Sequence, residues 1–415
     1  MTPYPRQGHD SQVRKSLWQR LLGLSLPGVL STFLLLPSLR LATSSASTFP
    51  QSPLALDSPC RGYLRREHLI APGKGWIIFE PHTSISAGIE SCSGQRLYWT
   101  DDNGKAWRDI TPPHMPTHSV GEVFFLDASH GWLLSSDALS EETNAKFYLF
   151  STADAGKNWR ALLLTRPMFR MYDDYTFPVQ LFFSDPVHGW MMWHWAIMNS
   201  RLNYLLATTD GGRTWKRLPE PPGPGPLQFL SRHEGWLIGG PVTPDGIPIP
   251  EAENLWTTHD GGIRWHVLSV PVPKGEGGEA YFSSFRFKDT RDGVAVAELQ
   301  LSGYVFRLFS CVTSDGGESW QISHFDSYHA SPSFVGDHII WSTSDWPEME
   351  VRIQRENRVV TPTLPLESGM RTRMSDVDFI DDRNGWAIAG QLLTTTDGGR
   401  TFRIITPPAV MQRLD

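Results

Sequence analysis

An eight-residue motif, Thr-x-Asp-x-Gly-x-x-Trp, occurs five times, with a sixth copy that ends in Phe402, and it constrains the fold of this chain more than any other feature. The copies, which we call the box motifs, begin at Thr100, Thr152, Thr208, Thr258, Thr313 and Thr395. Their aspartates are 52, 56, 50, 55 and 82 residues apart. Self-similarity at a period of about 50 residues is typical of a repeat architecture, in which each copy is one supersecondary unit. The last gap is wide enough for one further unit that has lost its box.

A second pattern runs in step with the box motifs: an apolar stretch, a polar turn and the dipeptide Gly-Trp. It occurs at Gly75–Trp76, Gly131–Trp132, Gly189–Trp190, Gly235–Trp236 and Gly385–Trp386. A variant, Gly293–Val294, precedes the fifth box, and the segment FVGDHIIW at 334–341 occupies the wide gap. The two patterns agree in spacing, and together they indicate seven repeat units, six of which carry the box.

Each unit divides into four short runs that are rich in β-branched and aromatic residues. In the third unit these runs are PVQLFF, WMMWHW, YLLATT and WKRL. Such runs between Gly and Asp turns are strand signals, and no helical periodicity competes with them. The pattern predicts an all-β fold, a seven-bladed β-propeller of four-stranded antiparallel blades over residues 63–408. We expect the ring to close by packing of the first and last sheets, without exchange of strands.

The box residues are expected to be structural, in the turn between the third and fourth strands of a blade. The Asp carboxylate can accept backbone N–H groups, the Gly supplies an unusual backbone conformation, and the Trp packs between neighbouring sheets. The predicted structural residues are Asp102, Asp154, Asp210, Asp260, Asp315, Asp397, Trp107, Trp159, Trp215, Trp265 and Trp320.

Residues 1–46 have the pattern of a secretory signal peptide. Arg14, Lys15 and Arg20 precede an apolar run at 21–39, and small residues follow up to Ala46. The alternative is an uncleaved anchor, because 19 apolar residues are nearly a membrane span. We therefore expect export to the periplasm or the extracellular space, with membrane contact only through this segment if it is retained. Residues 47–62 are then a linker and residues 409–415 a tail.

Composition and charge exclude several classes of function. The net charge is -7 and the sequence pI is about 6.1, whereas nucleic-acid binders usually carry a basic stripe. The fourteen histidines show no metal-ligand spacing, and we expect no metal and no cofactor. In an exported chain Cys60 and Cys92 could form a disulfide, whereas Cys311 lies in a predicted strand as a buried thiol.

The loop insertions point to a functional face. In a four-stranded blade, the turns after the first and third strands lie on one face, and the other connections lie on the opposite face. The insertions fall in the second class, and loops on a rigid scaffold are where binding concentrates. The loop at 165–177, TRPMFRMYDDYTF, could bind an anion or carry acid/base chemistry, or it could be merely solvated. Its candidate residues are Arg166, Arg170, Tyr172, Asp173, Asp174 and Tyr175.

The box motif resembles the Asp-box (BNR) repeat of sialidases, sortilin-type receptors and some xyloglucan hydrolases, where it is structural and lies away from the ligand. TTDGGRTW boxes with Gly-Trp strands also resemble the photosystem II stability and assembly factor family, over roughly residues 65–408. This resemblance implies an exported propeller without a known active site, an assembly chaperone that binds another protein through an arginine patch.

The rival function is an exo-sialidase or another glycoside hydrolase, with a carbohydrate as ligand. A sialidase has an Arg-Ile-Pro sequence near its first blade. The first unit here, at 63–80, reads YLRREHLIAPGKGWIIFE and lacks that sequence. Other glycosidases need two carboxylates at a suitable separation, which spacing in sequence does not give. A sortilin-like receptor would need a cysteine-rich domain after the propeller. We therefore favour a non-enzymatic scaffold without catalytic residues, with another protein as partner.

Overall fold

The computed structural model describes residues 48–50, 60–81, 94–115, 120–137, 146–164, 176–197, 200–223, 225–240, 254–272, 281–302, 305–327, 330–335, 338–345, 350–355, 358–365, 376–389, 391–405 and 411–412. All helices and strands assigned in these ranges are β-strands. Among them, no helix is long and apolar enough to cross a membrane. The predicted signal peptide at 1–46 lies outside the described residues, as does Cys92 of the predicted disulfide.

Consecutive strands pair into sheets that follow the repeat units. In pairing order, the first two sheets are β30 (Met411–Gln412), β2 (Cys60–Ala71), β3 (Lys74–Pro81), β4 (Arg96–Thr100) and β5 (Arg108–Asp109); and β6 (Val120–Phe125), β7 (Gly131–Ser136), β8 (Phe147–Thr152), β9 (Asn158–Leu164) and β1 (Thr48–Pro50). The next three sheets are β10 (Thr176–Phe183), β11 (Gly189–Ile197), β12 (Ser200–Thr208) and β13 (Lys216–Arg217); β14 (Leu227–Phe229), β15 (Gly235–Gly239), β16 (Asn254–Thr258) and β17 (His266–Leu268); and β18 (Tyr281–Phe287), β19 (Gly293–Ser302), β20 (Val305–Thr313) and β21 (Gln321–Ser327). The last two sheets are β22 (Ala330–Val335), β23 (His338–Asp345), β24 (Glu350–Arg355) and β25 (Arg358–Val360); and β26 (Asp376–Phe379), β27 (Gly385–Ile388), β28 (Leu392–Thr395) and β29 (Arg403–Ile404).

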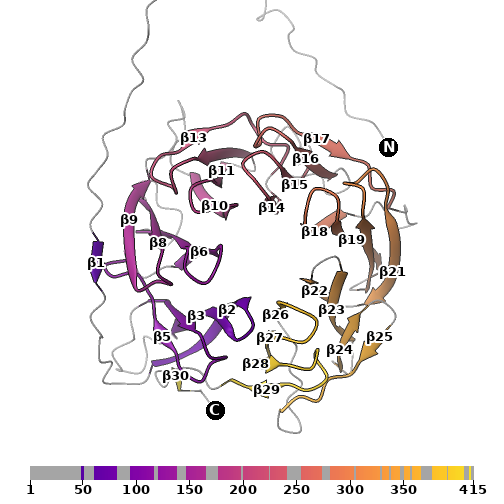
Figure 1. Ribbon diagram of the computed structural model, residues 1–415. Helices are drawn as coiled ribbons and strands as arrows, with labels where there is room; N and C mark the ends of the chain where they lie inside the picture. Colours follow the sequence, from indigo (N-terminus) through magenta and orange to yellow (C-terminus); the bar gives the residue numbers. More distant parts are fainter. Residues whose placement is uncertain are drawn as a thin grey trace, which may run out of the picture. The chain divides into compact units, whose positions relative to one another are not determined.

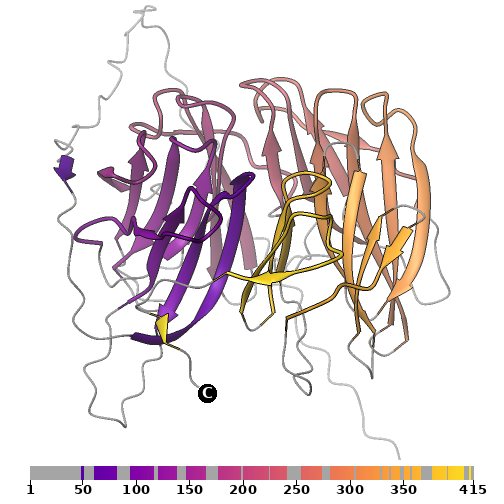
Figure 2. The same ribbon diagram turned by 60° about the horizontal axis from the view of Figure 1, so that its bottom comes forward.

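The sheets stand around a ring in chain order (Figures 1 and 2). The first strand of each unit, such as β6 or β10, lines the centre, and the fourth, such as β9 or β13, lies on the outside. Within each unit the strands pair antiparallel with their sequence neighbours. The predicted all-β propeller of four-stranded antiparallel units is therefore confirmed.

The fold prediction is corrected in its count and uniformity. Instead of seven alike blades, six blades close with a box turn, and sheet β22–β25 joins β24 to β25 without a box sequence. Two sheets have five strands rather than four, because β1 pairs with β9 and β30 pairs with β2. The β30–β2 pair is parallel, so that sheet is not wholly antiparallel. Edge strands present unpaired backbone groups, and extra segments can add there.

Aromatic stacking between neighbouring sheets explains the Gly-Trp pattern. The Trp132 ring stacks on Phe183 of the next sheet with centroids 3.6 Å apart, and Trp190 stacks on Phe229 at the same distance. The glycine leaves room for the phenylalanine: a Cβ on Gly189 would lie 2.4 Å from the Phe183 ring. The core therefore lies between the sheets, where each tryptophan covers the next sheet along the ring.

Six box turns share one hydrogen-bond pattern. The Thr hydroxyl donates to the Asp carboxylate at 2.8–3.0 Å, and the Gly N–H donates to the Thr hydroxyl at 2.9–3.0 Å. The residue after each Asp donates its N–H to the first turn of the same sheet, as Gly211 does to Val187 at 2.9 Å. That residue has positive φ, which glycine adopts readily: φ is 74° at Gly211 but 58° at Ala155. Each box turn is thus fixed to its own sheet.

The ring closes through strand pairing and side-chain bonds, which corrects the expectation of closure without strand exchange. Strand β30 lies in the predicted tail and pairs with β2 at Cys60 and Arg61. Nearby strands of the last and first sheets are joined by Asp378, which accepts the Leu69 N–H at 2.8 Å and lies 2.8 Å from Nδ1 of His68. The closing junction is therefore held by backbone and polar contacts as well as by sheet packing.

Candidate functional site: an arginine-lined pocket

The loop residues predicted to bind a ligand lie outside the described residues. These residues are Arg166, Arg170, Tyr172, Asp173, Asp174 and Tyr175. The larger insertions of the same face are likewise mostly outside the described ranges. The assignment of function to that face stays a prediction, and the described part of the chain offers a different site.

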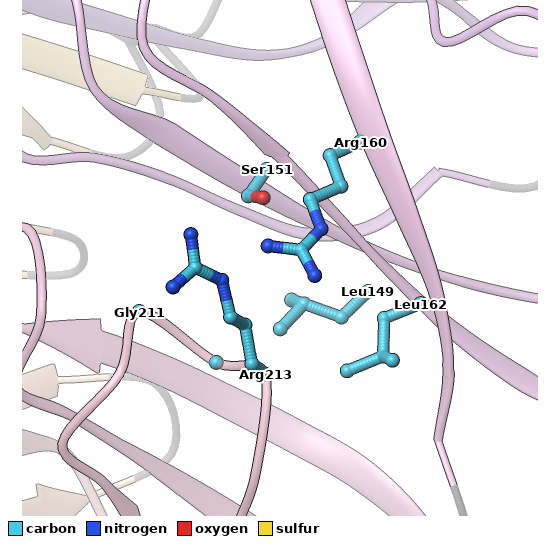
Figure 3. Close-up of a pocket in the computed structure, with 7 residues that line it drawn as sticks. Leu149, Ser151, Arg160, Leu162, Gly211 and Arg213 are labelled. Carbon is cyan, nitrogen blue, oxygen red and sulfur yellow. The ribbon is translucent and has the colours of Figure 1, made fainter. Parts of the chain in front are cut away.

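That site is a small pocket where the two outer strands of sheet β6–β9 meet the box turn between β12 and β13 (Figure 3). It is lined by Leu149, Ser151, Arg160, Leu162, Gly211, Gly212 and Arg213, and has about 220 Å³ of free space, the solvent at its mouth included. Leu149 is buried, Leu162 is half-buried and Arg213 is exposed. The pocket has room for one small polar group rather than for a drug-sized molecule.

Two elements bring the arginines together. Arg160 lies in β9, directly opposite Ser151 of β8. Arg213 follows Gly212 in the box turn of the next sheet, and a Cβ on Gly212 would lie 2.6 Å from the Leu149 side chain. Glycine at this position therefore lets the turn approach the neighbouring sheet closely. Figure 3 shows the guanidinium groups of Arg160 and Arg213 on either side of the pocket.

Neither arginine has a counter-charge among the described residues. Ion pairs in this part of the chain involve other side chains, and no hydrogen bond from Arg160 or Arg213 reaches a carboxylate. Asp210 of the same turn is already occupied: it accepts the Thr208 hydroxyl at 2.8 Å and the Thr214 N–H at 2.9 Å. Burial raises the pKa of Asp210, but these hydrogen bonds outweigh burial and hold the pKa below its usual 3.8. Two positive side chains thus meet at the pocket, and the described part of the chain supplies no carboxylate to either.

The preceding junction holds a large side chain at the position that Ser151 occupies here. We call the junction between sheets β2–β5 and β6–β9 the filled junction, and the junction between sheets β6–β9 and β10–β13 the open junction. Trp99 and Ser151 occupy the same repeat position, one residue before the box threonines Thr100 and Thr152. Trp99 is 1% exposed and fills the filled junction, whereas Ser151 leaves space at the open one.

The pocket is suited to binding an anion and not to acid/base catalysis. The planar guanidinium fork matches a carboxylate or another oxyanion in bidentate geometry, and the half-buried Ser151 supplies a hydroxyl. No carboxylate or histidine is among the residues that line this pocket. Over the ranges that the structure describes, no group of three or more metal-ligating side chains gathers.

The predicted structural residues fall in the box turns. Trp159 is 2% exposed and donates its Nε1–H to Ile110 O of the preceding sheet at 2.7 Å. Trp215 and Trp320 are half-buried and donate instead to a glycine carbonyl of their own turns. The structural role of these residues stays a prediction until they are substituted.

Sequence reasoning missed Arg160 and Arg213. Arg213 is part of the box motif TTDGGRTW, and the sequence pattern predicts a structural role for that motif as a whole. The available signal was a position-by-position comparison of the repeat units. That comparison sets arginine against lysine at Arg213 and Lys157. It distinguishes Ser151 from Trp99 of the first unit but not from Ala207 of the third.

No protein-family model matches the sequence, and no curated protein matches it. Solved structures do match. The chain is similar to a GH74 enzyme of Niastella koreensis, with 12% identity and a TM-score of 0.52 over 84% of this chain and 55% of that one. It is similar to a Mycobacterium tuberculosis puromycin-hydrolyzing peptidase, with 11% identity and a TM-score of 0.51 over 87% and 56%. A structure of YCF48 bound to a D1 peptide matches with 19% identity and a TM-score of 0.44 over 71% and 83%. The chain spans about half the length of the GH74 enzyme and of the peptidase, and the likeness to these two structures shows the propeller fold alone.

Proposed function

We propose that this chain is an exported, non-enzymatic β-propeller scaffold that binds a protein partner, and that a carboxylate of the partner enters the pocket between Arg160 and Arg213. The observation that carries the proposal is the pair of arginines at one pocket without a counter-charge among the described residues. Charge-assisted bidentate bonds to a carboxylate are among the stronger polar contacts, and arginine is enriched at protein interfaces.

Two features of the sequence support the scaffold and its location. The box and Gly-Trp motifs resemble Asp-box propellers of the photosystem II stability and assembly factor type, which bind other proteins. The basic and apolar pattern at 14–46 supports export, either with cleavage of the signal or with retention of residues 21–39 as an anchor. The pocket does not support a glycoside hydrolase, because hydrolysis of a glycosidic bond needs two carboxylates and none lines this pocket.

The test is binding of displayed short peptides with and without Asp and Glu. We expect the protein to select acidic peptides, and Arg160→Ala with Arg213→Ala to weaken their binding at least about tenfold, since a hydrogen bond to a charged group contributes about 1.5–3 kcal/mol. Selection of acid-free peptides with equal affinity would contradict the proposal.

A second variant separates the pocket from the general charge of the surface. Ser151→Trp places at the open junction the residue of the filled junction while both arginines stay, so it should block peptide binding. Lys216→Ala is the matched control, because Lys216 is an exposed cation at the repeat position of Arg160 in the next sheet. Equal losses in Ser151→Trp and Lys216→Ala would place the binding site elsewhere.

A further inference from the structure

The outer edge of sheet β6–β9 accepts an added strand. Strand β1 lies outside β9 (Figure 1) and pairs antiparallel with it. The register sets Thr48 opposite Arg160 and Pro50 opposite Asn158. Unpaired backbone groups at a sheet edge can pair with an extended segment of the same chain or of another chain. The edge that carries Arg160 is therefore a place where an extended segment of a partner can bind.

Strand β1 covers this edge only in part. It pairs with three of the seven residues of β9, and no other described strand pairs with the outer edge at 161–164. Pro50 has no N–H group to donate, which limits the pairing further. Leu163, in the part beyond β1, has 48% of its surface exposed. A longer strand would therefore form more backbone hydrogen bonds with β9 than β1 does, and it would set a side chain beside Leu163.

The position opposite Arg160 decides which side chain an added strand brings to the pocket. Residues directly opposite each other in an antiparallel pair have their side chains on the same face, with Cβ atoms about 4.5–5.5 Å apart. In β1 this position is held by Thr48, which is neutral. The described residues supply no carboxylate to Arg160 or Arg213. An added strand with Asp or Glu at this position would bring the missing carboxylate to the arginines of the pocket.

We propose that the acidic segment of the partner binds as an extended strand, which pairs antiparallel with β9 in place of β1 and sets its carboxylate residue opposite Arg160. This inference rests on the proposed function and specifies how the partner is held. Backbone hydrogen bonds along β9 supply affinity, and the carboxylate between Arg160 and Arg213 fixes the register. Strand β1 is then a strap, which holds the edge until the partner displaces it.

The first test methylates backbone nitrogens of an acidic peptide that the protein selects, and measures its affinity by calorimetry. In a strand added to a sheet edge, alternate residues direct their N–H groups toward the sheet, and the others direct them toward solvent. N-methylation of one alternate set should weaken binding at least about tenfold, because it removes several hydrogen bonds to β9. Methylation of the other set is the matched control and should have little effect. The carboxylate is the same in both peptides.

The second test changes the strap. Thr48→Glu supplies a carboxylate opposite Arg160 from within the chain, so it should weaken acidic-peptide binding about two- to fivefold, the scale of a cross-strand charge pair. Phe49→Glu is the matched control, because it adds the same charge at a position that alternates to the other face of the strand, and it should not weaken binding. Deletion of residues 48–50 should strengthen binding at least about twofold, because the partner no longer displaces the strap.

The outcomes separate this inference from the proposed function. Selection of acidic peptides, with equal effects of the two methylation patterns and no change on deletion of the strap, would overturn strand addition and leave the proposed function in place. Absence of any selection for acidic peptides would overturn both. Urea unfolding of the deletion variant should match that of the native chain, because the four remaining strands of sheet β6–β9 keep their mutual pairing. If that variant unfolds early, the methylated peptides decide the question on the native chain.

Discussion

The filled and open junctions share one backbone plan and differ in what occupies the space between the sheets. At both junctions a buried glycine of the box turn packs on the preceding sheet: Gly156 on Ile110 at the filled junction, and Gly212 on Leu149 at the open one. Trp99 closes the filled junction with a fully buried indole, whereas Ser151 leaves the open junction with a pocket.

The arginines of the two junctions also differ, in whether carboxylates lie near them. Arg108 and Arg160 occupy the same repeat position. Burial lowers the pKa of Arg108, while the charges of Asp101 and Asp154 act to raise it. Arg160 has no such carboxylate among the described residues. The comparison teaches that a fully packed junction and a junction with a pocket can stand beside the same box turn.

The largest effect should come from emptying the filled junction. Trp99→Ala removes an indole that is 1% exposed and should lower the free energy of unfolding by about 3–5 kcal/mol, the usual cost of a Trp→Ala cavity. Urea unfolding followed by circular dichroism measures the change. The matched variant at the open junction, Ser151→Ala, should change the free energy of unfolding by less than about 0.5 kcal/mol. Similar losses in the two variants would show that the junctions do not differ in packing.

The box turn should matter equally at both junctions. Asp210→Ala removes the acceptor of the Thr208 hydroxyl and the Thr214 N–H, and should lower the free energy of unfolding by about 1–3 kcal/mol. Asp154→Ala removes the corresponding bonds from Thr152 and Asn158 and should give a similar loss. An unchanged melting curve for both variants would refute the structural role of these aspartates.

A substitution at the filled junction should stabilise the protein. Ala155 has φ 58°, where the open junction has Gly211 at 74°. A left-handed conformation costs a residue with a Cβ about 1 kcal/mol, so Ala155→Gly should raise the free energy of unfolding by up to about that amount. Gly211→Ala should lower it, because it introduces the same strain at the open junction. Thermal melts of the two variants should therefore shift in opposite directions, and shifts of the same sign would contradict the prediction.

Acid should weaken the box turns of both junctions without distinguishing them. Burial raises the pKa values of Asp154 and Asp210, but hydrogen bonds from the turns outweigh it and hold both pKa values below 3.8. A group with a lowered pKa in the folded state contributes stability above its unfolded pKa, and that contribution is lost as the pH falls through the folded value. The free energy of unfolding should therefore fall below about pH 4, and fall less steeply in Asp154→Asn and Asp210→Asn. An equally steep fall in the native protein and in both variants would show that these carboxylates do not contribute to the pH dependence of stability.

The propeller could be predicted because its signals are local. Each strand is a short run bounded by Gly or Asp turns, and each box turn is closed by residues within four positions, such as Thr208, Asp210 and Gly212. The stacking of Trp190 on Phe229 repeats wherever the Gly-Trp pattern and its phenylalanine recur. The added strands β1 and β30 have no such pattern, because backbone pairing at a sheet edge does not specify side chains.

The pocket could not be predicted from any one motif. It depends on Ser151 and Arg160 being opposite in register, and on Arg213 being brought against them from another sheet. A local pattern contains neither the register nor the contact between sheets. Comparing the units does not single out position 151 either, because only the first unit has a tryptophan there and the others have smaller residues such as Ala207. The richest predicted loop lies outside the described residues.

The closing junction sets the order in which the protein can be completed. Trp159 reaches Ile110 across 49 positions of the chain, but the bond between Leu69 and Asp378 spans 309. At a synthesis rate of about 5–20 residues per second, the two partners emerge from the ribosome roughly 15–60 s apart. Neighbouring sheets can assemble during that interval, while the inner edge of β2 waits for its partner. Nascent chains thus pass through an open arc. The Phe287 N–H donates to Gln228 Oε1 of the preceding sheet at 2.8 Å, across only 59 positions. Pulsed hydrogen exchange should therefore find the Leu69 amide protected after that of Phe287.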